Sequence, residues 1–431
     1  MQGLREKLIE TRRDFHKYAE SMWKEYRTTS IVAKHLIALG IPITMGADLS
    51  VKGMQFQYPD KETIENEKQR AILQGADPEL IEKMCDLPGV MGTIDTGREG
   101  PVTAFRFDMD ALPFSETLNE DHKPVRENYV SINDGSCHAC GHDGHTAVGM
   151  VVAEELMKIK DQLCGKIKLI FQPSEEGGGG ARGIVEKGCL DDVQYLFVGH
   201  VGLTKLDGLP LKSHGIIGGA KDFLDSRRYN IIYKGKAAHP CGNPNDGKNA
   251  LLASCVAALG IHTIPPHSQG EFHQNVGVMH AGSSRNTIAA DSYMEVEVRG
   301  ENDIVAEYGE RKMLAVVKGA AEAYEVGYDV VLIGKSASGA SDDAAIDIVI
   351  KCAKTLPWFT EFHSVGSVGG SDDASEMLRR VQKNGGVGTY IGLGTNFTTS
   401  FHDKAFDFDE DVLEPSAELF VKIVEEVQSN N

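Results

Sequence analysis

The sequence contains no unbroken run of about 18 apolar residues, so it predicts no membrane-spanning helix. Residues 1–20 are charged throughout and lack the apolar stretch of a secretory signal. The eight cysteines are scattered over 431 residues, without the dense spacing of a disulfide framework. These absences predict a cytoplasmic protein with free thiols and no membrane contact.

Positive charge is also scarce, because the sequence has 44 Lys and Arg but 63 Asp and Glu, which gives a formal net charge of -19. Such an acidic chain disfavours nucleic acid and anionic membrane surfaces as partners. An anionic substrate would therefore need specific local cations. The hydrophobic content of 41% suits a globular protein, and 431 residues exceed one ordinary core, so two domains are predicted.

The outer parts of the chain alternate strand and helix patterns, which predicts an α/β domain with a mostly parallel core sheet. The predicted strands there are residues 90–96, 102–110, 166–173 and 193–201, with a helix over 145–159. The middle of the chain instead gives the order strand, helix, strand, strand, helix, strand, which is the ferredoxin-like pattern of an α+β domain. We therefore expect a small domain at 221–334, inserted between 1–220 and 335–431 of the larger one.

What the chain does contain is a dense cluster of metal-ligating side chains, CHACGHDGHTA, at 137–147. Cys140 and His142 flank Gly141, so in an extended segment both project to the same side. Thiolate and imidazole are good ligands for zinc and later first-row metals. A Cys137–Cys140 redox pair lacks its usual context, and no second ligand pair follows at zinc-finger spacing, so a metal site is the favoured interpretation.

A second polar cluster, FQPSEEGGGGARG, begins where the predicted strand 166–173 ends. Adjacent Glu175 and Glu176 would repel each other if both were ionised, unless a cation lay nearby. One carboxylate can bind a metal while the other accepts a proton from the attacking water. A phosphate loop is excluded because no Lys-Ser/Thr follows the glycines. The alternative is an exposed acidic turn.

Three further features stand at predicted strand ends or late in the chain. His200 ends the strand 193–201, and His402 lies in SFHDKAFDFDE. Either histidine alone would be unremarkable, but carboxyl ends of strands are where α/β sheets place ligands. In FRFDMDA, Asp110 could orient a histidine from behind, while Asp108 is expected to pair with Arg106.

These motifs, in this order, resemble the M20 metallopeptidase family, in particular its aminoacylase and indole-acetyl-amino-acid hydrolase branch. The residues that carry the resemblance span nearly the whole chain: 12–20 (RRDFHKYAE), 105–113 (FRFDMDALP), 138–145 (HACGHDGH), 171–181 (FQPSEEGGGGA), 237–240 (AAHP) and 282–286 (GSSRN). The Tyr18-Ala19-Glu20 sequence and an extra segment at about 54–88 resemble members that hydrolyse p-aminobenzoyl-glutamate. The small inserted domain matches the lid or dimerisation domain of that family.

The resemblance implies a role for each matching residue. It implies two divalent ions, manganese or zinc, bound by Cys140, His142, Glu176, His200 and His402. It implies Glu175 as general base, with Asp110 and Asp143 as supports. It also implies that His239 stabilises the oxyanion in a partner subunit's site. Substrate contacts would come from Arg285, Asn286 and Ser371.

The implied reaction is hydrolysis of the amide bond of a small N-acyl or N-aroyl amino acid. Two alternatives stay open within the same chemistry, a general aminoacylase and a small metallo-carboxypeptidase. A third is a non-catalytic support subunit, which need not keep Glu175 and five ligands. The implied assembly is a homodimer or a heterodimer with a related M20 subunit.

Overall fold

The structure is a computed structural model that describes residues 3–429. It divides into two compact units, Met1–Asp222 with Ala340–Asn431, and Phe223–Gly339. Among the described residues, no helix combines the length and the apolar character needed to cross a membrane.

The first unit contains a mixed nine-stranded sheet in the order β1-β2-β4-β3-β5-β13-β7-β12-β6. Its strands are β1 (Ile43–Met45), β2 (Val90–Asp95), β3 (Val102–Asp108), β4 (Lys166–Gln172), β5 (Tyr195–Val201), β6 (Thr204–Lys205), β7 (Gly215–Ala220), β12 (Glu361–Ser367) and β13 (Val387–Leu393). The central run β4-β3-β5-β13 is parallel, and β7 pairs in parallel with β12. The predicted α/β fold is confirmed, with antiparallel pairing added at β1-β2-β4, β13-β7 and β12-β6.

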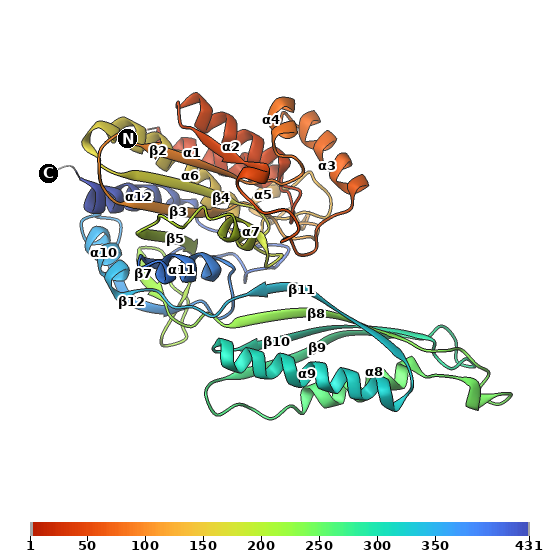
Figure 1. The fold of residues 1–431 in the computed structure, drawn as a ribbon. Helices are drawn as coiled ribbons and strands as arrows, with labels where there is room; N and C mark the ends of the chain where they lie inside the picture. The colour runs from red at the N-terminus through yellow and green to blue at the C-terminus, as the bar shows by residue number, and fades with distance from the viewer. Residues whose placement is uncertain (1–2, 430–431) are drawn as a thin grey trace. The chain divides into compact units, whose positions relative to one another are not determined.

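Helices cover both faces of this sheet (Figure 1). They are α1 (Leu4–Lys17), α2 (Tyr26–Ala38), α3 (Lys61–Leu73), α4 (Pro78–Lys83), α5 (Lys123–Arg126), α6 (His142–Ile159), α7 (Gly180–Glu186), α10 (Asp343–Ala353), α11 (Ala374–Lys383) and α12 (Leu413–Gln428). Phe420 of α12 packs on Gly199 of β5, and Leu378 of α11 packs on Gly388 of β13 from the other face. With both faces covered, six of the seven residues in each of β3 and β4 are buried.

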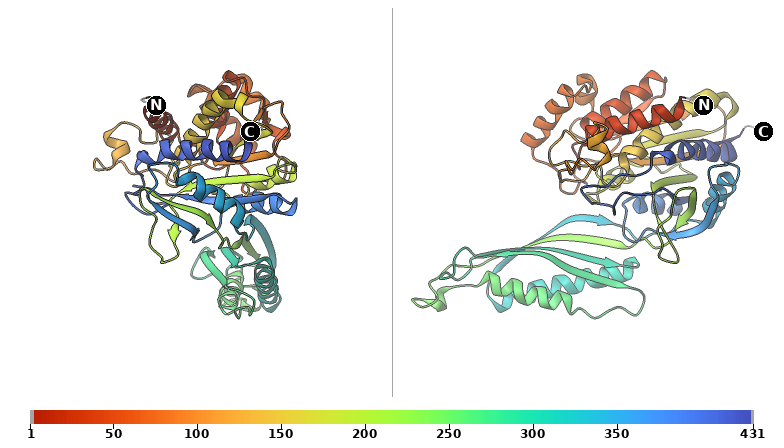
Figure 2. Two further views of the ribbon diagram at one scale, coloured as in Figure 1. Left: turned by 90° about the vertical axis from the view of Figure 1, so that its left-hand side faces the viewer. Right: turned by 180° about the vertical axis from the view of Figure 1, so that it is seen from behind.

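The second unit is a four-stranded antiparallel sheet in the order β11-β8-β10-β9, with α8 and α9 side by side on one face (Figure 2). Its elements are β8 (Asp225–Lys234), α8 (Ala250–His262), β9 (Phe272–Ala281), β10 (Asp291–Gly300), α9 (Asp303–Ala323) and β11 (Gly327–Ser336). Met294, Val296 and Val298 alternate along β10 and are buried in this unit's own core. The strand and helix order is the one that the sequence predicts.

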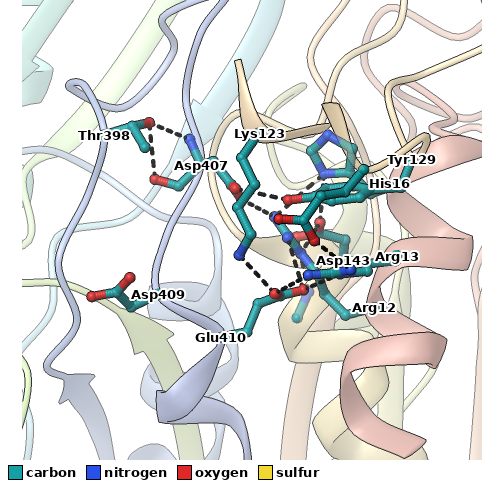
Figure 3. A network of polar contacts seen from close by, with 12 residues as sticks. Arg12, Arg13, His16, Lys123, Tyr129, Asp143, Thr398, Asp407, Asp409 and Glu410 are labelled. Carbon is teal, nitrogen blue, oxygen red and sulfur yellow. Dashed lines mark hydrogen bonds and ion pairs between the residues drawn. The ribbon is translucent and has the colours of Figure 1, made fainter. Parts of the chain in front are cut away.

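A buried network of charges in the first unit ties α1 to α6 and to the loop before α12 (Figure 3). The guanidinium of Arg12 is fully buried and lies 2.7 Å from Asp143 and 2.6 Å from Asp407. Arg13 donates two hydrogen bonds of 2.7 Å to Glu410. Burial alone would raise the pKa of Glu410, but the hydrogen bond from Arg13 and the charge of Arg12 lower it to about 2.

We predict that Arg13→Gln lowers the free energy of unfolding at pH 7 by about 1–3 kcal/mol, because the pKa of Glu410 then returns toward its ordinary value. Since the folded pKa of Glu410 is depressed, its stabilisation is present above about pH 4.5 and is lost as the pH falls toward 2. The difference between wild type and variant should therefore shrink over that range in urea titrations.

Arg5→Gln is the matched control, because Arg5 lies on the same helix and pairs with Asp411 where both side chains are more than half exposed. Exposed pairs contribute about 0–1 kcal/mol, so this variant should change stability little. Equal losses of stability in the two variants at pH 7 would show that the Arg13–Glu410 pair does not stabilise the fold more than an exposed pair.

Candidate metal centre

Thiol, imidazole and carboxylate groups of the first unit meet at the carboxyl ends of three adjacent parallel strands. Asp108 ends β3, Glu175 and Glu176 follow β4, and His200 lies near the end of β5. Cys140 and His142 come from the start of α6, which packs on β3 and β4. Ligand atoms of Cys140, His142 and Glu176 all lie within 4.8 Å of one another. This edge is where α/β sheets bind ligands.

His142 is oriented for coordination through one nitrogen. Its Nδ1 lies 2.8 Å from the backbone oxygen of Asp110 and donates to it. Its Nε2 is buried and has no hydrogen-bond partner among residues 3–429. A buried imidazole nitrogen without a partner is costly, unless its lone pair meets a metal ion.

His200, like His142, is oriented through its Nδ1. Its Nδ1 donates to the backbone oxygen of Val201 over 2.8 Å, and its Nε2 lies 3.6 Å from the sulfur of Cys140. Burial lowers the pKa of His200 well below its usual value, so the ring is neutral, which is the form that binds metals. Burial, with the neighbouring Glu176, raises the pKa of the Cys140 thiol. A bound cation would reverse that effect and favour the thiolate.

Glu176 connects this group to His402, whose Nε2 lies 3.4 Å from Glu176 Oε1. The loop after β13 carries His402, which has a positive φ of 64° and whose backbone N–H donates to Ala139 over 2.9 Å. Burial alone would raise the pKa of Glu176, but hydrogen bonding with His402 lowers it. An ionised Glu176 beside Cys140 and two histidines is a suitable ligand set for a divalent ion.

Asp110 holds the turn that carries both glutamates. Its two carboxylate oxygens accept the backbone N–H groups of Glu175 and Glu176, each over 3.0 Å. Asp110 is 1% exposed, so these hydrogen bonds are protected from water. The turn cannot shift without breaking charge-assisted hydrogen bonds in the interior.

Asp108 and His145 lie beside the candidate ligands, and their ligand atoms lie within 4.8 Å of those of His142 and His200. Both nitrogens of His145 are already engaged, however. Its Nδ1 lies 2.6 Å from Asp108, and its Nε2 accepts the N–H of Val201 over 3.0 Å. His145 therefore positions the segment that carries His200, and it has no lone pair left for an ion.

The side chain of Glu175 lies among other acidic side chains. Its carboxylate is within 4.8 Å of those of Asp372 and Asp373, which follow Ser371 in the loop before α11. Arg106 lies 3.2 Å from each of these aspartates and also pairs with Asp108, as the sequence predicts. Burial and the charge of Asp372 raise the pKa of Glu175 well above its usual range. A carboxyl group with a raised pKa is suited to accepting and returning a proton.

The remaining predicted site residues lie in the second unit. His239, Arg285 and Asn286 are exposed, in loops joined by a hydrogen bond of 2.9 Å between Ile288 N–H and the Ala238 carbonyl. The Nδ1 of His239 accepts the N–H groups of Cys241 and Gly242, over 3.2 and 3.0 Å. Its proton therefore resides on Nε2, which makes this exposed ring a hydrogen-bond donor.

The fold and the cluster of candidate ligands are those of one class of protein, the metal-dependent hydrolases. The model of the peptidase family M20/M25/M40 matches residues 104–426. The chain belongs to this family, and it is a hydrolase that acts on amide bonds.

Individual relatives match over almost their full length. The chain is 40% identical to one subunit of the p-aminobenzoyl-glutamate hydrolase of Escherichia coli (strain K12), covering 97% of this chain and 95% of the relative. It is also 40% identical to the indole-3-acetyl-aspartic acid hydrolase of Enterobacter agglomerans, over 94% and 92%. The crystal structure of an aminobenzoyl-glutamate utilization protein from Klebsiella pneumoniae matches with a TM-score of 0.84 and 35% identity, over 100% and 98%.

The structure adds polar residues to which the sequence assigned no individual role. His145, Asp372 and Asp373 lie against the predicted groups, and Glu25 contacts the turn before Glu175. His145 follows His142 by three residues on α6, so helical spacing could have placed it nearby. The two aspartates stand in a polar motif of residues 370–375, whereas no local signal marks Glu25.

We predict that His142→Gln and Cys140→Ala each lose at least one bound ion, whereas His145→Gln binds the wild-type number at saturation. Because His145 only positions its neighbours, its loss should weaken metal affinity by about 10–100-fold. Elemental analysis by mass spectrometry gives the stoichiometry, and competition with a chelator gives the affinity. If His145→Gln also loses an ion at saturation, His145 is a ligand.

Proposed function

We propose that the protein is a di-metal amidohydrolase that cleaves the amide bond of an aroyl- or acyl-amino acid, with p-aminobenzoyl-glutamate as the best candidate substrate. The observation that carries the proposal is that Glu175 immediately precedes the candidate ligand Glu176, in a turn whose two N–H groups both donate to Asp110. A proton-accepting carboxyl group beside a ligand cluster is what metal-assisted hydrolysis requires.

In this proposal the metal ligands are Cys140, His142, Glu176, His200 and His402. Two divalent ions held there would polarise the amide carbonyl and lower the pKa of the attacking water. The thiol of Cys140 favours zinc, and the family resemblance favours manganese. All eight cysteines are free, which supports a reducing compartment such as the cytoplasm.

Glu175 is the proposed general base. It would accept a proton from the attacking water and then donate it to the leaving amine. Asp110 would hold Glu175 in place through the backbone, and His142 through its ring. Burial beside Asp372 keeps the proton affinity of Glu175 high enough for both transfers.

The substrate class follows from two relatives of equal identity. One is named for p-aminobenzoyl-glutamate and the other for indole-3-acetyl-aspartic acid. Both names describe an aromatic acyl group joined to an acidic amino acid, so we propose this class for the present protein. In an acidic chain the free carboxylates would need local donors, and we propose Arg285, Asn286 and Ser371 for that role.

We further propose that the protein acts as a dimer, either with itself or with a related M20 subunit. Four apolar side chains of α8 support this: Leu251, Leu252, Val256 and Leu259, the last of which is 69% exposed. β9 is an edge strand of the second unit's sheet, and its outer side has no strand partner among residues 3–429. His239 would then donate a hydrogen bond to the oxyanion in the partner's site, a contribution of about 2.7–4 kcal/mol by analogy with measured donors.

We predict that Glu175→Gln keeps both ions but lowers kcat by about 10²–10⁴-fold, on general-base precedent. Glu176→Gln should instead lose metal, because its carboxylate is a proposed ligand. Metal content and kcat are measured on the same preparations. Equal metal loss in the two variants would show that base and ligand are not separate roles.

The substrate proposal is tested with a panel of amides on the metal-loaded protein. We expect kcat/KM to be highest for p-aminobenzoyl-glutamate or indole-3-acetyl-aspartate and at least about tenfold lower for N-acetyl amino acids, since an unfilled pocket and unpaired donors lower transition-state binding. Glu175→Gln controls for a contaminating hydrolase. Preference for N-acetyl amino acids would indicate a general aminoacylase, and no hydrolysis at all would favour a support subunit.

Two inactive variants should restore activity to each other if His239 acts across a dimer. Mixing His239→Ala with Glu175→Gln chains would place one intact site in each mixed dimer, so up to about a quarter of all sites should recover. The oligomeric state is measured first, and subunit exchange is followed by mass. A mixture that exchanges but stays inactive would place His239 in its own subunit's site or outside catalysis.

A further inference from the structure

The turn between β4 and the two glutamates has three consecutive backbone N–H groups that all donate to buried carboxyl groups. Those of Glu175 and Glu176 donate to Asp110. The N–H of Ser174 donates instead to Oε1 of Glu25, over 2.8 Å. Ser174 has a positive φ of 52°, a conformation that non-glycine residues rarely adopt. The turn therefore needs support from outside its own sequence.

Glu25 stands at the N-cap of α2, but its side chain does not cap that helix. The backbone N–H groups of Arg27 and Thr28, at the start of the helix, donate instead to the carboxylate of Glu20, over 3.0 and 2.7 Å. Glutamate is not among the preferred N-cap residues, and here its side chain bonds to a residue 149 positions away. With Glu20 capping α2, Glu25 is available for the turn.

The contact between Glu25 and Ser174 is closed to water. Both residues are 0% exposed. The second oxygen of Glu25 and the hydroxyl oxygen of Ser174 have no hydrogen-bond partner among the described residues. Such a buried hydrogen bond is costly to lose, because the Ser174 N–H would remain unpaired in the interior.

We propose that Glu25 is a positioning residue for the reaction, because it fixes the backbone of Ser174 and so the direction in which Glu175 and Glu176 leave β4. The inference rests on the proposed function for its catalytic meaning. Glu25 and Asp110 together bind all three N–H groups of the turn. Glu25 accepts the N–H of the first residue, and Asp110 accepts the N–H groups of the next two.

Because the turn is short, the hydrogen bond from the Ser174 N–H to Glu25 affects both the candidate base Glu175 and the candidate ligand Glu176. Ser174 directly precedes the base, and a rotation of its backbone would displace Glu175 and Glu176 together. The turn has little slack, because a β-carbon on Gly177 would lie 2.5 Å from the Ser174 hydroxyl oxygen. A displacement of about 1 Å at a catalytic group can lower a rate by about 10²-fold.

The test compares Glu25→Ala with Glu25→Gln, whose amide oxygen can still accept the Ser174 N–H. We expect Glu25→Ala to lower kcat by about 10–100-fold with KM within about threefold of wild type, and to weaken metal binding by about tenfold. Glu25→Gln should stay within about threefold of wild type in all three quantities. Ser30→Ala is the matched control, because buried Ser30 of α2 accepts the backbone N–H of Asp77, away from the turn.

Amide hydrogen exchange provides a readout that does not depend on activity or metal. In the metal-free protein, Glu25→Ala should accelerate exchange in a peptide covering residues 172–180 by at least about tenfold, whereas Glu25→Gln and Ser30→Ala should not. Wild-type exchange of that peptide in Glu25→Ala, or a kcat no lower than that of Ser30→Ala, would overturn the inference. If wild type hydrolyses no amide, the proposed function fails, and the exchange experiment alone then decides whether Glu25 fixes the turn.

Discussion

The carboxylate of Asp110 is the constraint on which the rest of the site depends. Asp110 lies two residues after the end of β3, and its carboxylate accepts two backbone N–H groups of the turn after β4. Its backbone carbonyl accepts a hydrogen bond from the ring of His142. One buried residue thus fixes the candidate base and two candidate ligands relative to one sheet edge. Burying a carboxylate is costly unless it is hydrogen-bonded. The hydrogen bonds that stabilise Asp110 in the interior therefore also order the site.

Buried cations balance only part of the acidic charge around this constraint. Arg106 pairs with Asp108, Asp372 and Asp373, and Arg12 pairs with Asp407 and with Asp143, which follows His142 on α6. These pairs engage both guanidinium groups. The remaining negative charge lies where His142 and His200 direct their Nε2 atoms, so a divalent ion would complete the electrostatic balance at that position.

Much of the fold could be predicted from the sequence, because the central strands and the helix α6 are strongly patterned and their motifs are local. The ferredoxin-like order of the second unit followed from clean alternation in β10 and long helical stretches around it. The antiparallel edge strands β1 and β6 were not predicted, since strands of three and two residues leave no periodic signal. The short helix α4 was missed for the same reason.

By itself, the sequence determined which candidate ligands the site has, since thiol, imidazole and carboxylate groups cluster within a few residues at 137–147 and 175–176. It could not assign His145, because only the tertiary structure shows that Asp108 and Val201 occupy both ring nitrogens. Nor could it reveal Glu25, whose partner lies 149 residues away. Local spacing specifies which groups are near one another along the chain, whereas a hydrogen bond between distant segments exists only once the sheet has brought them together.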